Sequence, residues 1–189
     1  MSLQSWLQNS WLVQRATSPE EIKNLLAISD RDLSACQVNQ LPSDWRCAIA
    51  YNAALQAATA ALAAGYRAAR DNHHYRVIQS LEFTTAPGRK SIDTLDGFRK
   101  KRNVSSYDVA GAVSDKEADE MLKLAASLRA DVEKWIRATH SELFKPTVWQ
   151  RDASRPKWTG WSRNPEHGGE SGSLNQLGAQ NTNLLSCTA

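Results

Sequence analysis

The sequence has no long apolar stretch, few cysteines and no large excess of charge of either sign. No ten consecutive residues among its 189 are all apolar, so no transmembrane helix is predicted and we expect no membrane association. A composition of 41% apolar and 23% charged residues is typical of a folded domain rather than of a disordered chain. The net charge of +3 gives the chain no polycationic character.

Paired cysteines and several common motifs are also missing. The three cysteines form no C-x-x-C pair, so neither a disulfide framework nor a zinc site is predicted, and we expect no metal and no cofactor. The first twelve residues lack the basic start and apolar stretch of a secretory signal, and we therefore expect a cytoplasmic protein. Glycine-rich phosphate loops and the H-E-x-x-H and G-x-S-x-G motifs are absent, which removes the commonest hydrolase, kinase and dehydrogenase interpretations.

The seven tryptophans reveal two segments of different composition. The last 45 residues hold three of the seven Trp and five of the nine Gly, with only five large aliphatic side chains. This segment cannot build a core, so we predict a folded domain at 1–144 and a low-complexity, disordered extension at 145–189. The alternative for the extension is a single-strand RNA-binding tail, because Trp149, Trp158 and Trp161 alternate with basic residues. The other four tryptophans are expected to lie against the core or at its entry: Trp6, Trp11, Trp45 and Trp135.

The folded segment has the pattern of helices separated by short breaks. Ser18 and Ser114 each begin a capping box, and apolar residues then recur every three or four positions. The stretch 48–64 contains ten Ala in seventeen positions, which predicts close approach of neighbouring helices. We predict five helices, at about 19–38, 44–64, 73–83, 90–102 and 115–136.

The predicted fold class is all-α. No stretch alternates with a period of two, so strands are not expected, and Gly65-Tyr66-Arg67 is interpreted as the fraying end of the second helix. Five helices with short connections pack most simply as an up-and-down bundle. Because a bundle alone implies no function, function has to be inferred from particular side chains.

The densest polar cluster is Arg99-Lys100-Lys101-Arg102-Asn103, followed by Tyr107-Asp108. One interpretation is a solvated helix end. The other is that Arg102 and Asn103 bind a phosphate, since Arg binds phosphate bidentately and Asn adds a directional donor. Four consecutive basic residues cannot share one helix face, so at most two of them can line one site.

The remaining charged candidates are weaker. His73 and His74 diverge by about 100° on a helix, so they cannot chelate one metal ion together. Three interpretations remain for each of these histidines: a hydrogen bond at the start of the helix, exposure to solvent, or a catalytic role. Arg46 and the run Asp30-Arg31-Asp32 are interpreted as structural charges on surface faces.

Several strings together resemble the HEPN family, the higher eukaryote and prokaryote nucleotide-binding helical domains. They are listed in chain order: Ala48-Ile49-Ala50-Tyr51-Asn52-Ala53-Ala54-Leu55, Ala61-Leu62, Gly65-Tyr66-Arg67, His73-His74 and Arg102-Asn103-x-x-x-Tyr107-Asp108. The resemblance covers roughly Leu3 to Leu143. It implies a helical bundle that forms a homodimer, with the polar motifs facing a shared cleft. It also implies a small nucleotidyltransferase as a possible partner protein.

Many HEPN domains are metal-independent endoribonucleases of toxin–antitoxin or defence systems, with an R-x4-6-H motif. The resemblance places Arg102 at the Arg position and Asn103 at the polar position, but Tyr107 stands where the His would be. A tyrosine titrates near ~10 and a histidine near ~6.5, so Tyr107 would cost about 5 kcal/mol more as a base at neutral pH. Arg-Asn-x-x-x-Tyr-Asp looks like non-toxin branches of the family, in which binding is inferred more readily than cleavage.

Three functions therefore remain open. The first is binding of a nucleotide or RNA phosphate by Arg99, Arg102, Asn103 and Tyr107. The second is an endoribonuclease in which Arg102 and Asn103 act with Tyr107, or with His74 if the fold brings it to the Arg102 site. The third is a structural module that binds another protein.

Overall fold

The helices of the computed structural model begin where the sequence provides caps. The structure describes residues 2–38, 40–105 and 113–144, and all of them belong to one compact unit. At the start of α2 (Pro19–Ala35), Ser18 accepts a hydrogen bond from the backbone N–H of Glu21. At the start of α6 (Asp115–Thr139), Ser114 and Glu117 form a reciprocal capping box. The two predicted cap positions are confirmed.

The described part of the chain is an all-α bundle, as predicted. Its helices are α1 (Leu3–Gln8), α2, α3 (Ser43–Ala63), α4 (His73–Ser80), α5 (Arg89–Ser105) and α6, with short 3-10 helices η1 (Leu81–Phe83) and η2 (Ser141–Phe144). The five predicted helices are all present, and α1 is an additional helix that the sequence pattern did not predict. The predicted extension, 145–189, and the predicted turn at Tyr107 and Gly111 lie outside the described residues.

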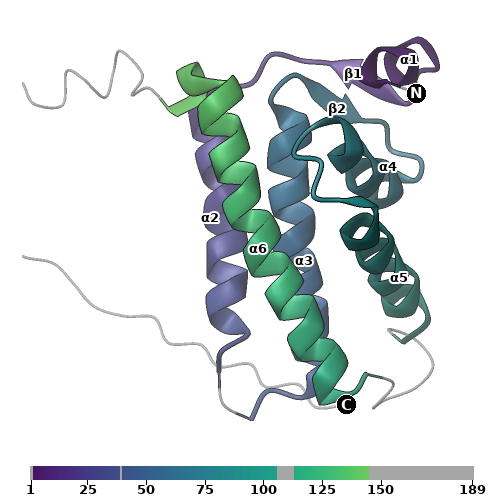
Figure 1. Cartoon of the computed structure of the whole chain (residues 1–189), viewed down its shortest axis with the longest axis vertical. Coiled ribbons are helices and arrows are strands. Elements are labelled where there is room, and N and C mark those ends of the chain that lie inside the picture. The colour runs from purple at the N-terminus through teal and green to yellow at the C-terminus, as the bar shows by residue number, and fades with distance from the viewer. Residues whose placement is uncertain (1, 39, 106–112, 145–189) are drawn as a thin grey trace, which may run out of the picture. The chain divides into compact units, whose positions relative to one another are not determined.

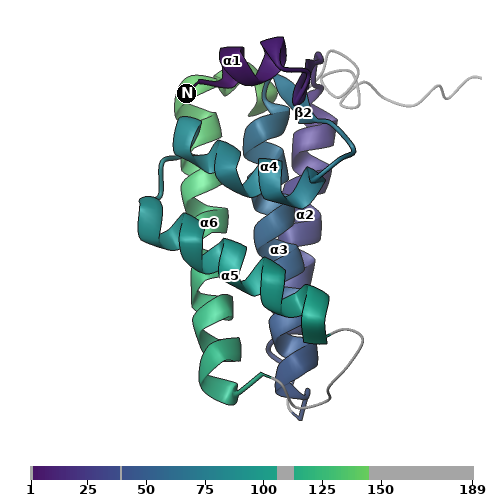
Figure 2. The ribbon, with the colours of Figure 1, turned by 90° about the vertical axis from the view of Figure 1, so that its right-hand side faces the viewer.

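Helices α2, α3 and α6 lie side by side (Figure 1). Helices α4 and α5 form a hairpin that crosses this layer obliquely, and both contact α3 (Figure 2). None of the helices in the described ranges combines the length and apolar content that crossing a bilayer requires.

Helix α3 is the centre of the bundle and is buried on almost every side. Its alanines allow α2, α4, α5 and α6 all to contact it, because a methyl side chain keeps neighbouring backbones close. The alanines exposed by no more than 1% are Ala50, Ala53, Ala54, Ala57, Ala58, Ala60, Ala61 and Ala63. The predicted close approach is therefore confirmed, and α3 places Tyr51 deep under the α4–α5 hairpin.

The prediction that strands are absent is wrong. Leu12–Gln14 (β1) and Tyr66–Ala68 (β2) pair as a short antiparallel ribbon. Three-residue strands are too short to show a period of two, so their sequence gave no signal. Of the residues interpreted above as frayed helix, Gly65 precedes β2, and Tyr66 and Arg67 belong to it.

Arg67 explains why the chain leaves the helix at this point. Its Nη1 donates to the carbonyl of Ala63 at the end of α3, 2.9 Å away. Its Nη2 pairs with Glu21 of α2 at 2.7 Å. These contacts satisfy a terminal helix carbonyl with a tertiary partner, which local sequence does not reveal.

The first turn of α6 is joined to α3 and α5 by ion pairs. Arg46 of α3 pairs with Asp119 at 2.9 Å, and Lys101 of α5 pairs with Glu117. The hydrogen bond from Lys101, followed by those from Ser114, lowers the pKa of Glu117 to about 2. The C-terminal part of α5 is thereby fixed against α6 next to Arg102.

Two side chains are placed differently from their predictions. Trp45, expected against the core or at its entry, is 64% exposed on the first turn of α3. Asp32, interpreted as a surface charge, is only 6% exposed and accepts hydrogen bonds from Asn52 and Arg31. Asp32 lies within α2 on the side facing α3, where the hydrogen bond from the Asn52 amide compensates for its burial.

Candidate functional site

Residues from three helices meet around the ring of Tyr51. Tyr51 lies in α3 and is 1% exposed. The guanidinium carbon of Arg102, from α5, lies 5.5 Å from the centroid of the Tyr51 ring. Nδ1 of His74, from α4, lies 3.4 Å from the Tyr51 hydroxyl oxygen. The fold thus brings His74 and Arg102 to the same aromatic ring, although 27 positions separate them in the sequence.

The environment keeps both Tyr51 and His74 uncharged at neutral pH. Burial raises the pKa of Tyr51 to about 12, although Arg102 and Arg99 act in the opposite direction. Burial, and then the positive charge of Arg102, lower the pKa of His74 below its ordinary 6.5. A neutral hydroxyl therefore faces a neutral imidazole.

The contact between the Tyr51 hydroxyl and His74 is compatible with either tautomer of the imidazole, because a phenol oxygen both donates and accepts hydrogen bonds. In the tautomer whose Nδ1 accepts from Tyr51, the ring proton is on Nε2, and His74 presents an Nε2–H donor on the far side of its ring. A donor beside a guanidinium suits an anion such as phosphate.

Arg99 forms a second stack one helical turn before Arg102. Its guanidinium carbon lies 5.5 Å from the centroid of the Tyr75 ring. Its Nε donates to Asp96 at 2.7 Å, and Asp96 also pairs with Lys100 at 2.9 Å. Burial alone would raise the pKa of Asp96, but hydrogen bonds from Arg99 and Lys100 outweigh it and the pKa is lowered. The ionised carboxylate fixes the orientation of Arg99.

The four consecutive basic side chains diverge, as predicted from helix geometry. Arg99 and Arg102 stack on aromatic rings of α4 and α3, respectively. Lys101 is directed to Glu117 of α6, and the side chain of Lys100 is 69% exposed. Two of the four cations therefore line one site. Asn103 belongs to α5, but its side chain and the whole of Tyr107 lie outside what the structure describes, so their assigned roles stay predictions.

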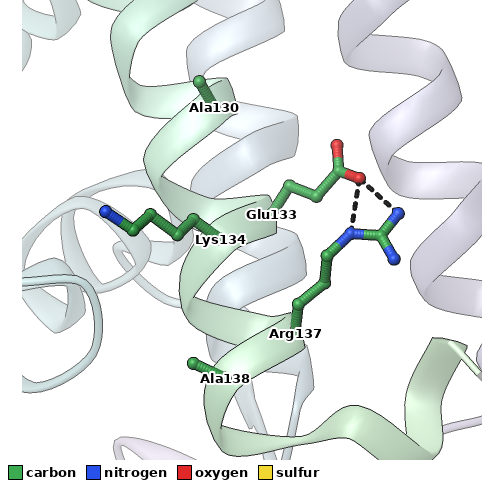
Figure 3. A pocket seen from close by; sticks show the side chains of 5 residues that line it. All are labelled: Ala130, Glu133, Lys134, Arg137 and Ala138. Atoms are coloured by element: carbon green, nitrogen blue, oxygen red, sulfur yellow. Dashed lines mark hydrogen bonds and ion pairs between the residues drawn. The ribbon is translucent and has the colours of Figure 1, made fainter.

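A shallow hollow lies along α6, between Ala130 and Ala138, and it contains no comparable cluster. Figure 3 shows Glu133 and Arg137 directed toward each other across it. Arg137 donates to Glu133 through Nε at 2.8 Å and through Nη2 at 2.6 Å, and Arg129 donates to the other carboxylate oxygen at 2.6 Å. These i,i+4 pairs compensate one another, which makes this surface a salt-bridged helix face.

Metal ligands are not gathered anywhere in the described ranges: no group of three His, Cys, Asp or Glu side chains lies there in a suitable arrangement. The rings of His73 and His74 are inclined at 64° with centroids 6.0 Å apart, in keeping with their divergence on the helix. Cys36 and Cys47 are both buried and unbridged.

Comparison of the chain with models of known protein families, with curated proteins and with solved structures gives no match. The resemblance to the HEPN family therefore stays a prediction based on the quoted residues.

Sequence reasoning did not assign a role to Tyr51, Tyr75 or Asp96. Asp96 stands three and four residues before Arg99 and Lys100, a spacing that predicts ion pairs on a helix, so a signal was available. Tyr51 lies in an alanine-rich stretch that predicts only packing. Its contact with Arg102 depends on how α5 crosses α3, which no local pattern specifies.

Proposed function

We propose that this chain is a HEPN-like helical domain that binds the phosphate of a nucleotide or RNA at the cluster formed by Tyr51, His74, Arg99 and Arg102. The observation that carries the proposal is the convergence of Arg102 and His74 on the buried ring of Tyr51. Following the family resemblance, the proposed assembly is a homodimer, with a small nucleotidyltransferase as a possible partner protein.

The cluster has the properties that phosphate binding requires. Arg102 provides a permanent charge with paired donors, and the Tyr51 ring beneath it limits the positions that its guanidinium can adopt. His74 adds a neutral donor that needs no protonation near pH 7. Such preorganisation reduces the entropy lost when an anion binds.

Equilibrium binding to the full chain tests this function. AMP, ADP and a fluorescent five-nucleotide RNA strand are titrated at 50 mM and 200 mM salt. We expect binding that weakens as salt rises, because phosphate contacts release counterions. If none of the three probes bound, a protein-interaction module would replace the proposal.

A metal-independent endoribonuclease is the second candidate, because the structure brings His74 to the Arg102 site. The lowered pKa of His74 leaves its imidazole neutral near pH 7, which suits a general base. Proton donation would require the imidazolium, which the lowered pKa disfavours.

Cleavage of the RNA strand in EDTA distinguishes the two candidates. A binding domain is expected to leave the strand intact over hours. Products with 2′,3′-cyclic ends, absent with Arg102→Gln and at least tenfold slower with His74→Ala, would establish the nuclease instead. Arg89→Gln, at the start of α5 and thirteen residues before Arg102, provides a matched control variant.

A further inference from the structure

Tyr75 is an aromatic side chain on the surface of α4 that the bundle core does not use. It is 43% exposed even though Arg99 lies over its ring. A tyrosine on an amphipathic helix normally turns its ring toward the core, as Val77 and Ile78 of the same helix do. Tyr75 instead leaves part of its ring open to solvent beside a cation.

The Tyr75–Arg99 stack continues the proposed phosphate site. Tyr75 directly follows His74 on α4, and Arg99 precedes Arg102 by three residues on α5. Three residues correspond to a rise of about 4.5 Å along a helix and return to the same face. Two cation–aromatic stacks thus stand next to each other on the α4–α5 hairpin, one buried at Tyr51 and one open at Tyr75.

A third cation–aromatic contact involves the residue after Tyr75. Arg76 of α4 lies with its guanidinium carbon 5.8 Å from the centroid of the Trp11 ring. Consecutive helical side chains diverge by about 100°, so Arg76 lies on a different face of α4 from Tyr75. The two neighbouring cations Arg99 and Arg102, with one open ring beside them, are still more than a single phosphate needs. Phosphates along a strand can contact the cations, while bases can stack on an open ring.

We infer that Tyr75 and Arg99 form a base-stacking platform beside the Arg102 phosphate site, and that the ligand is a single strand of nucleic acid. This inference rests on the function proposed above and specifies its ligand class. The bases of a duplex cannot stack on Tyr75, because they are already stacked on one another and their faces are covered. A stacked base contributes about 1–3 kcal/mol, which corresponds to roughly 5- to 150-fold in affinity.

Three matched strands test the platform on the full chain by fluorescence anisotropy. They are a five-nucleotide uridylate RNA, the corresponding thymidylate DNA, and an abasic DNA strand that keeps its five sugar-phosphate units. Tyr75→Ala removes the ring, Tyr75→Phe keeps it, and Arg102→Gln removes the adjacent phosphate contact. Thermal unfolding of each variant checks that the fold is retained.

Tyr75→Ala is expected to weaken binding of the base-containing strands by roughly 5- to 150-fold and to leave the abasic strand unchanged. Tyr75→Phe should bind like wild type. A loss confined to the RNA strand would identify RNA as the ligand, and equal losses would identify single strands of either kind.

The platform and the proposed function fail in different ways. Wild-type affinity of Tyr75→Ala for all three strands, together with a loss in Arg102→Gln, would overturn the platform and leave the phosphate site standing. No binding of any strand by the wild-type chain would overturn both.

Discussion

Replacing Tyr51 by alanine should lower the free energy of unfolding by about 3–5 kcal/mol, as truncation of a buried aromatic side chain does. The ring is 1% exposed in the central helix and packs beneath the α4–α5 hairpin. Neighbouring alanine methyls cannot extend into the vacated volume, so the cavity persists. Since small domains are stable by only about 5–15 kcal/mol, this loss is large. Chemical denaturation followed by circular dichroism measures it.

Tyr51→Phe separates the structural role of the ring from that of its hydroxyl. It keeps the ring under Arg102 and removes only the partner of His74 Nδ1. We expect a loss of about 1 kcal/mol or less, because the hydroxyl forms one long hydrogen bond. A similar destabilisation by Phe and by Ala would contradict the packing of Tyr51 described here.

Replacing Arg102 by glutamine should weaken binding of a short RNA strand by about 10- to 150-fold. Loss of a charge-assisted hydrogen bond to phosphate costs about 1.5–3 kcal/mol, and each 1.4 kcal/mol is tenfold in affinity. The salt dependence should also become shallower by about 0.7 in logarithmic slope for each lost contact with a single strand. Affinities measured by anisotropy at several salt concentrations give both quantities.

Arg89→Gln is the matched control for Arg102→Gln. Both residues lie on α5, and both changes remove one positive charge. Arg89 stands thirteen residues earlier, at the other end of the helix, about 20 Å away along its axis. It pairs there with Asp93 at 3.0 Å and is 63% exposed. Equal losses in the two variants would indicate general charge attraction and would remove Arg102 from the site.

Local sequence signals predicted the helices well because their determinants are local. Ser18 and Ser114 act on backbone groups three residues away, so their effects can be read without knowing the fold. The ribbon of β1 and β2 could not be read in this way. Its pairing joins residues more than fifty positions apart, as Leu12 opposite Ala68 shows.

The site was predictable only in part, because some of its features follow from local helix geometry and others from contacts between residues far apart in the sequence. Helix periodicity sufficed to predict that the side chains of Arg102 and Lys101 lie on different faces of the helix. It also predicted that Arg99 lies one turn from Arg102. The meeting of His74 with Arg102 at Tyr51 depends on the oblique crossing of the α4–α5 hairpin over α3 (Figure 2). Trp45 shows the opposite error, since a large apolar residue in a helix favours burial, whereas Trp45 is 64% exposed on the first turn of α3.

The pH titration of His74, followed by NMR, is the most direct test of the central claim that His74 and Arg102 share one anion site. Because the pKa of His74 is lowered, the folded chain binds fewer protons than the unfolded chain as pH falls below 6.5. Acidification therefore lowers the free energy of unfolding through this group. His140, on the C-cap of α6, is the internal control.

We expect the pKa of His74 to lie below 6.5 in the free chain. It should rise when Arg102→Gln removes the neighbouring charge, and again when wild type binds an RNA strand whose phosphate stabilises the imidazolium. A His74 pKa that moved neither with Arg102→Gln nor with RNA would contradict the shared site.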